Sequence, residues 1–206
     1  MRNLFKIVIV FAVLSIVMSG FTSCTSTTSP SKDAAGSAAA NTNAAEDSAA
    51  KNNNYPPAPS GIMQADIKDL EGNTFKLEDK KGKVVLVNLW GIWCAPCIAE
   101  MPHLIEMQNK FKDKDFQIVG LNVGNDEGEE EPAENIKTFA EKKKLNYQLG
   151  YADEKLFEEF VKVSRMAGVP QTILINREGK LTGVFTGGGP KIINSMKESV
   201  EKIVGE

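Results

Sequence analysis

The amino-acid sequence predicts an α/β sandwich with a mixed central sheet in residues 61–206. Apolar runs of strand length at 84–90 and 116–123 alternate with stretches of helical period, as parallel strands joined by helices do. Two further strand-like runs, at 171–176 and 181–186, are separated by a Glu-Gly turn and predict an antiparallel hairpin. Parallel and antiparallel pairs together give a mixed sheet.

The first half of this domain predicts a hairpin, a buried strand and a helix. Residues 67–70 and 74–77 flank a Gly-Asn turn, the pattern of a β-hairpin. Residues 84–90 are almost continuously apolar, as expected of a central strand covered on both faces. Residues 97–111 repeat apolar side chains with the period of a helix, and Pro102 is expected to kink it.

The second half predicts further strands and helices in alternation. Residues 116–123 form a second buried strand, and an acidic loop then leads into a helix over 133–144. A short strand is expected at 145–149, and Asp153 is placed to cap the next helix. After the final hairpin, an amphipathic helix over 190–204 closes the chain.

The first 24 residues predict an export signal rather than a part of the fold. Arg2 and Lys6 are basic, and the apolar run at 7–18 is shorter than the roughly 20 residues of a membrane span. Cys24 follows where a lipoprotein signal places its acylated cysteine, so we predict lipidation there. A cleaved soluble signal and a retained anchor are the alternatives, and both give the same exported location.

Residues 25–60 are rich in Ser, Thr, Ala, Asn and Pro, and they predict a disordered tether. As a flexible chain they would span about 30–36 Å, which suits a domain held off a membrane surface. The whole chain has 24 basic and 27 acidic residues and no basic stripe, which disfavours nucleic acid as a partner.

The most informative segment holds Cys94 and Cys97, where the predicted central strand turns into a helix. Two thiols at this spacing, one of them at a helix N-terminus, can cycle between dithiol and disulfide. A metal pair is disfavoured, because a tetrahedral site needs roughly four ligands and His103 is the one histidine of the chain. The glycine run at 187–189 lacks the Lys-Ser/Thr of a phosphate loop and predicts a flexible turn.

These residues resemble the TlpA/ResA-like group of the thioredoxin superfamily over nearly all of residues 61–206. The segments that carry the resemblance are Asn88–Cys97, Glu100, Pro102, Asn122–Gly124, Gly168–Pro170, Ile173–Asn176 and Glu178–Lys180. The resemblance implies a thioredoxin-like three-layer sandwich with an N-terminal β-hairpin and an inserted helix at 133–144. One departure is Gln171, which follows Pro170 where the group usually has Thr.

The resemblance also implies roles for the reactive residues. Cys94 is expected to be the nucleophile and Cys97 the resolving thiol. Glu100 matches the glutamate of the group, and it replaces the buried Asp that plain thioredoxin has at the position of Asn88. We expect Glu100 to accept the proton of Cys97 or to raise the thiol pKa values by its charge. The alternative is an exposed helix glutamate.

Four residues are expected to contact the substrate. Trp93 flanks the nucleophile and shapes the contact surface, whereas Trp90 is expected in the core. Pro96 stiffens the loop between the thiols at an early helical position. Pro170 is implied to be cis and to face the disulfide, which would leave the backbone of Val169 free to pair with a substrate strand.

We therefore expect a lipid-tethered, extracytoplasmic thiol–disulfide oxidoreductase that works as a reductant, with no cofactor besides its own disulfide. The resemblance implies substrates such as apocytochrome c or other exported disulfide proteins, and a transmembrane thiol carrier as electron donor. An oxidant remains open, because the redox poise depends on the surroundings of the thiols. A thiol peroxidase, which usually has Thr where Gly91 stands, and a copper carrier are the alternatives.

Overall fold

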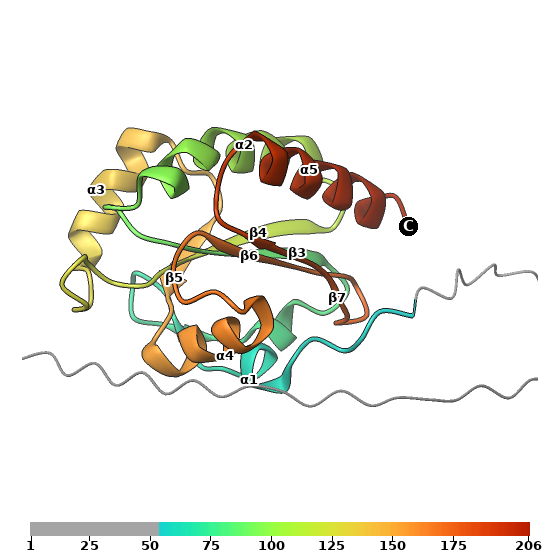
Figure 1. The fold of residues 1–206 in the computed structure, drawn as a ribbon, viewed down its shortest axis with the longest axis horizontal. Helices are drawn as coiled ribbons and strands as arrows, with labels where there is room; N and C mark the ends of the chain where they lie inside the picture. The colour runs from blue at the N-terminus through green and yellow to red at the C-terminus, as the bar shows by residue number, and fades with distance from the viewer. Residues whose placement is uncertain (1–53) are drawn as a thin grey trace, which may run out of the picture. The chain divides into compact units, whose positions relative to one another are not determined.

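The computed structural model describes residues 54–206; the predicted signal peptide, Cys24 and most of the predicted tether lie outside the described residues. A mixed five-stranded sheet of order β5-β4-β3-β6-β7 lies between two helical layers (Figure 1). Its strands are β3 (Val84–Trp90), β4 (Phe116–Asn122), β5 (Gln148–Tyr151), β6 (Gln171–Ile175) and β7 (Leu181–Thr186). The predicted thioredoxin-like sandwich is confirmed.

The large sheet contains both parallel and antiparallel strand pairs. β3 is parallel to β4, and β4 is parallel to β5, so each pair requires a crossover connection. β6 runs antiparallel to β3 and to β7, as the predicted C-terminal hairpin requires. A second sheet is a short antiparallel pair of β1 (Ile67–Lys68) and β2 (Thr74–Phe75), followed by a 3-10 turn at Leu77–Lys80.

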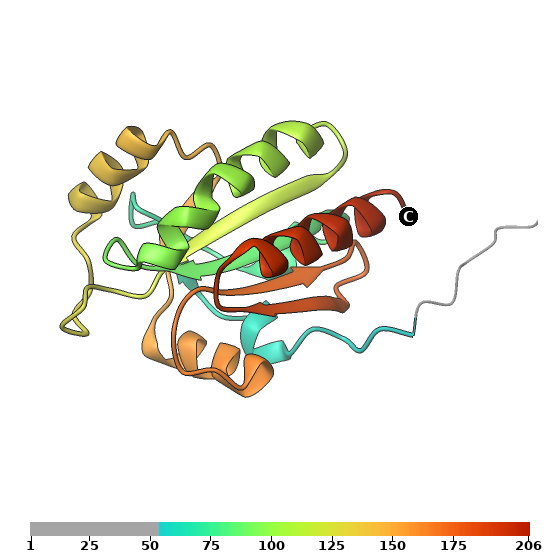
Figure 2. The ribbon, with the colours of Figure 1, turned by 45° about the horizontal axis from the view of Figure 1, so that its top comes forward.

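The helices cover both faces of the large sheet. One face is covered by α2 (Ala95–Phe111) and α5 (Pro190–Val204), which lie side by side (Figure 2). On the other face lie α1 (Ser60–Met63) and α4 (Glu154–Ser164), while α3 (Ala133–Lys143) extends the first layer beyond α2. None of the helices between residues 54 and 206 has the length and apolar character needed to span a bilayer.

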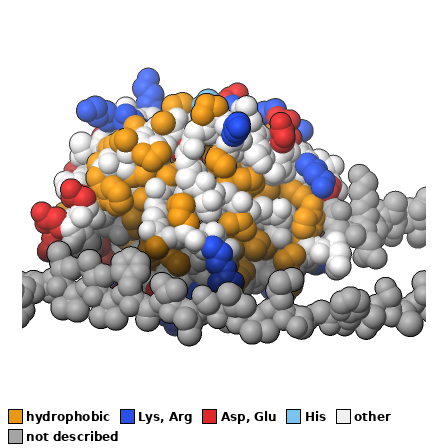
Figure 3. Space-filling view, in the orientation of Figure 1, with side chains coloured by type: hydrophobic (Ala, Val, Ile, Leu, Met, Phe, Trp, Pro, Cys, Tyr) orange, Lys and Arg blue, Asp and Glu red, His pale blue; other side chains and the backbone are white. Residues whose placement is uncertain are grey.

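Alternating side chains of the strands divide the core into two faces. Leu86 of β3 and Ile118 of β4 pack against α2 and α5, whereas Val87 and Leu121 pack against α1 and α4. Strands buried on both faces explain why β3 and β4 are continuous apolar runs in the sequence. On the face shown in Figure 3, basic and acidic side chains are interspersed among apolar ones.

The domain begins before residue 61, so the expected end of the tether is corrected. Pro57 forms a β-bridge with Lys180, and the amide of Leu181 donates to the carbonyl of Pro56. Ala58 is buried in the core. This segment has almost no large apolar side chain, and it is fixed by backbone hydrogen bonds that composition does not reveal.

Three elements have bounds that differ from those expected. The hairpin keeps two residues in each strand, because Asp69 Oδ1 accepts from the amides of Glu71 (2.9 Å) and Asn73 (2.8 Å) and takes over the turn. The strand expected at 145–149 is β5, at 148–151, because Leu145 N still donates to a carbonyl of α3. The helix expected over 97–111 begins two residues earlier and continues through Pro102.

Candidate active site

The two candidate redox cysteines form a disulfide at the start of α2. The Sγ atoms of Cys94 and Cys97 are 1.99 Å apart and their Cα atoms 5.3 Å. Cys94 is the N-cap residue of α2, and its Sγ accepts a hydrogen bond from the amide of Cys97 at 3.2 Å. After reduction, this N–H and the helix N-terminus favour a thiolate at Cys94. Both side chains are buried, with 3% of Cys94 and 0% of Cys97 exposed.

The two tryptophans beside the disulfide have opposite environments, as predicted. Trp90 ends β3 and is fully buried, and its ring stacks on Phe139 of α3 at a centroid distance of 5.5 Å. Trp93 is 47% exposed, and its Nε1 donates to the carbonyl of Gly124 at 2.9 Å. That hydrogen bond fixes an apolar surface next to Cys94.

Two loops from the C-terminal half contact the redox loop. The Val169–Pro170 bond is cis, as predicted, and Val169 packs against the cluster that contains both cysteines. Gly187 N donates to the carbonyl of Pro170 at 2.9 Å. A Cβ at Gly188 would lie 2.9 Å from the Cβ of Pro96, so only glycine fits there without a shift. The glycine run that predicted a flexible turn therefore packs against the site.

Glu100 is buried, and the alternative of an exposed helix glutamate is wrong. The side chain is 1% exposed, and its Oε1 accepts from Nδ2 of Asn88 at 2.7 Å. Asn88 Nδ2 also donates to the hydroxyl of Thr172 at 2.9 Å. Burial raises the pKa of Glu100 to about 7, and the hydrogen bond from Asn88 opposes part of that rise. The carboxyl therefore changes charge near neutral pH.

Sequence reasoning missed Tyr147, which lies close to this acid. Its hydroxyl is buried without a hydrogen-bond partner among the described residues, and so is Oε2 of Glu100. Burial, and after it the charge of Glu100, raises the pKa of Tyr147. The ring lies over Gly120, where a Cβ would be 2.9 Å from Tyr147 Cε2. Gly120 pairs with Asn88 in the β3–β4 register, and a glycine inside a central strand was the available signal.

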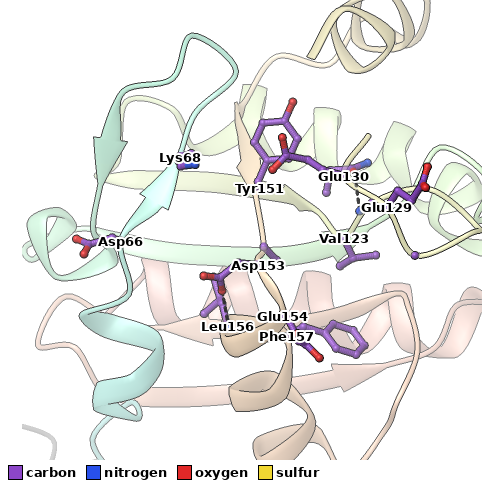
Figure 4. Close-up of a pocket in the computed structure, with 14 residues that line it drawn as sticks. Asp66, Lys68, Val123, Glu129, Glu130, Tyr151, Asp153, Glu154, Leu156 and Phe157 are labelled. Carbon is purple, nitrogen blue, oxygen red and sulfur yellow. Dashed lines mark hydrogen bonds between the residues drawn. The ribbon is translucent and has the colours of Figure 1, made fainter. Parts of the chain in front are cut away.

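A pocket of about 500 Å3 opens near the ends of β4 and β5 and the start of α4 (Figure 4). Gly124, whose carbonyl accepts the hydrogen bond from Trp93, contributes to its wall, but neither Cys94 nor Cys97 does. Its charged lining residues are Asp66, Lys68, Glu129, Glu130, Asp153 and Glu154. Within residues 54–206, no three His, Cys, Asp or Glu side chains are grouped as metal ligands.

Comparisons with known proteins agree with this geometry. Residues 57–184 match the model of the AhpC/TSA family. The thiol-disulfide oxidoreductase ResA of Geobacillus thermodenitrificans is 32% identical over 137 residues, which are 66% of this chain and 72% of the relative. ResA of Bacillus subtilis is 33% identical over 130 residues, 63% of this chain and 65% of the relative.

Two solved structures have the same fold. A thiol:disulfide interchange protein of the thioredoxin family from Chlorobium tepidum is 25% identical, with a TM-score of 0.60 over 73% of this chain and 97% of that chain. A thiol:disulfide interchange protein from a Bacteroides species is 29% identical, with a TM-score of 0.55 over 71% of this chain and 90% of that chain.

Proposed function

The chain belongs to the AhpC/TSA family and is a thiol–disulfide oxidoreductase of the thioredoxin superfamily, and we propose that it reduces disulfides of exported proteins outside the cytoplasm. The observation that supports this most directly is the Cys94–Cys97 disulfide, with Cys94 at the N-cap of α2 and the buried acid Glu100 one turn after Cys97. Apocytochrome c, with its Cys-x-x-Cys-His segment, is the proposed type of substrate.

The reaction is a pair of thiol–disulfide exchanges. In the reduced protein, the Cys94 thiolate attacks one sulfur of the substrate disulfide, and the other substrate sulfur leaves as a thiolate that takes up a proton. The Cys97 thiol then loses its proton and attacks the Cys94 sulfur; the bond between Cys94 and the substrate breaks, and the second substrate sulfur leaves as a thiolate that takes up a proton. The products are a substrate dithiol and the Cys94–Cys97 disulfide seen here, so the protein loses the two electrons that the substrate gains.

Glu100 is the proposed acceptor of the Cys97 proton. A carboxyl with a pKa near 7 is half ionised at neutral pH, so it can both take up and return a proton there. The variant Glu100→Gln keeps an acceptor for Asn88 but cannot ionise. We expect slower release of the mixed disulfide and altered thiol pKa values; unchanged values of both would remove Glu100 from the mechanism.

The proposed substrate contacts are Trp93, Pro96, Val169 and Pro170. Trp93 and Pro96 are exposed beside the disulfide. Within the part of the chain that the structure describes, neither the amide nor the carbonyl of Val169 makes a hydrogen bond. An extended substrate segment can pair with these groups as an added strand while its disulfide meets Cys94.

We also propose a cellular location for the protein and a donor that reduces its disulfide after each turnover. The export signal would direct the chain out of the cytoplasm, and the lipidated Cys24 and the tether would then hold the domain at a membrane surface. A transmembrane thiol carrier would return two electrons by the same exchange chemistry. Cells that express the protein can be grown with a radioactive fatty acid to test the anchor. We expect label in the wild-type protein and none in the Cys24→Ser variant.

Gly91 argues against peroxidase chemistry. It stands three residues before Cys94, where a thiol peroxidase usually has threonine. A Cβ at this position would lie 2.8 Å from the Trp93 ring, so a threonine does not fit unless Trp93 moves. A metal carrier would differ in its readout, because it would bind copper or zinc stoichiometrically without disulfide turnover.

The direction of electron flow is tested by the reduction potential of the cysteine pair. We expect equilibration of the purified protein with a dithiol buffer to give a value near or below about −230 mV, toward the thioredoxin end of the scale. A value near about −120 mV would mark an oxidant. The variant Cys97→Ser should trap the mixed disulfide with an oxidised Cys-x-x-Cys-His peptide, whereas Cys94→Ser should not.

A further inference from the structure

The side chain of Gln171 joins the segment before the cis-proline to the end of α4. Gln171 is the first residue of β6 and is completely buried. Its Nε2 donates to the carbonyl of Gly168 at 2.6 Å, and its Oε1 accepts from the hydroxyl of Ser164 at 2.6 Å. One carboxamide therefore holds both ends of the loop 165–168.

The loop also contacts Ser164, the hydroxyl partner of Gln171. Ser164 is the last residue of α4, and Arg165 ends the helix in the left-handed region, with φ 59°. Ser164 Oγ also accepts from the amide of Met166 at 3.1 Å, so the hydroxyl that binds Gln171 orders the first turn of the loop. The carbonyl that Gln171 binds belongs to Gly168, and glycine has more backbone freedom than any other residue type.

Gln171 itself is rigidly placed. Its backbone pairs with Leu89 of β3 on one side and with Thr186 of β7 on the other, so it lies in the middle of the sheet. A threonine at this position would carry its hydroxyl on Cβ, two carbon atoms closer to the backbone than the carboxamide. That hydroxyl could not bind Gly168 and Ser164 together.

We propose that Gln171 is a positioning residue that sets the preference of this protein for extended polypeptide disulfides over small ones. The loop that it holds leads directly into Val169, whose backbone groups make no hydrogen bond within residues 54–206 and whose side chain packs against the cysteine cluster. A loop that is already ordered does not lose conformational entropy when a substrate strand pairs with it. A small disulfide does not pair with this backbone and gains nothing from it.

This inference rests on the proposed function, and single-turnover oxidation of the reduced protein tests the two separately. The substrates are an oxidised Cys-x-x-Cys-His peptide and hydroxyethyl disulfide, each at several concentrations. If the unchanged protein is oxidised by neither, the proposed function fails. If it is oxidised by both, the variants decide the inference.

For Gln171→Thr, we expect the half-saturating concentration of the peptide to rise about tenfold, the equivalent of about one or two lost hydrogen bonds. The limiting rate, the reduction potential and the rate with hydroxyethyl disulfide should stay within about twofold. Gln148→Thr is the matched control, because Gln148 is also hydrogen-bonded but lies in the edge strand β5. An unchanged peptide half-saturation, or an equal loss with both disulfides, would overturn the proposal.

A second variant keeps the test valid if Gln171→Thr does not fold, as judged by circular dichroism. Ser164→Ala removes one partner of the carboxamide and leaves the buried glutamine in place. We expect a rise of about threefold in the peptide half-saturation and no change with hydroxyethyl disulfide. A Ser164→Ala protein that binds the peptide as well as the unchanged protein would show that the loop needs no anchor.

Discussion

The burial of Glu100 should make the stability of the oxidised protein depend on pH in a way that one substitution removes. The pKa of this carboxyl is about 7 in the folded protein, against 4.5 for the same group without burial. Between these values the folded form holds a proton that the unfolded form has lost. Stability from this source is therefore fully present below pH 4.5, falls as the pH rises through 7, and is absent above.

The size of the effect follows from the shift. At about 1.4 kcal/mol per pKa unit, the rise from 4.5 to about 7 corresponds to about 3 kcal/mol between pH 4 and pH 8. The variant Glu100→Gln has no proton to lose. The wild-type protein should lose about 3 kcal/mol of its free energy of unfolding between pH 4 and pH 8 through Glu100, and the variant should not. The difference in unfolding free energy, variant minus wild type, should therefore be about 3 kcal/mol larger at pH 8 than at pH 4.

Urea unfolding of the oxidised protein at several pH values measures this difference. The disulfide prevents both thiols from titrating, and other titrating groups contribute equally to the two proteins. Glu141→Gln, on the exposed side of α3, is the matched control and should show no such trend. A difference that does not change with pH would refute the argument. A change of opposite sign would mean that the hydrogen bond from Asn88 outweighs burial.

The remaining predictions concern stability. Gly120→Ala should destabilise the fold by about 1–3 kcal/mol in denaturant unfolding, because the new Cβ would lie 2.9 Å from Tyr147 Cε2 and 3.2 Å from Trp90 Nε1; an unchanged midpoint would mean that the ring moves freely. Tyr147→Phe should leave thermal stability unchanged or raise it, since the hydroxyl is buried without a partner among the described residues; a loss above about 1 kcal/mol would contradict that environment. Asp153→Ala should cost about 1 kcal/mol, because Asp153 Oδ1 accepts from Leu156 N at 2.8 Å at the start of α4, and Asp153→Asn should restore most of it.

Elements with strong local signals were predictable, and elements fixed by distant partners were not. The apolar runs of β3 and β4 and the cap at Asp153 depend on neighbours in the sequence, and the structure has them where expected. The position of β5 depends on how α3 ends, with Lys144 in the left-handed region. The segment 55–58 depends on pairing with the β6–β7 turn, which no local pattern reveals.

The candidate site divides in the same way. The spacing of Cys94 and Cys97 predicted the redox loop, and the family resemblance implied the cis form of Pro170; the structure has both. The resemblance implied the role of Glu100, but its own segment does not predict its burial, because a charged residue on a helix is usually exposed. Its environment comes from Asn88 of β3 and from Tyr147, which are remote in the chain. The anchoring role proposed for Gln171 likewise depends on contacts with α4.

The bridge between Pro57 and Lys180 fixes the point at which the described part of the chain enters the domain. Lys180 lies in the turn after β6, opposite Asn176, and the cis-proline comes just before β6, so the two are about 20 Å apart along the strand at ~3.3 Å per residue. The described chain thus enters at one end of the sheet, and the redox loop with its buried disulfide lies at the other. The segment that enters the domain therefore lies away from the redox loop and leaves the proposed substrate-pairing edge at Val169 uncovered.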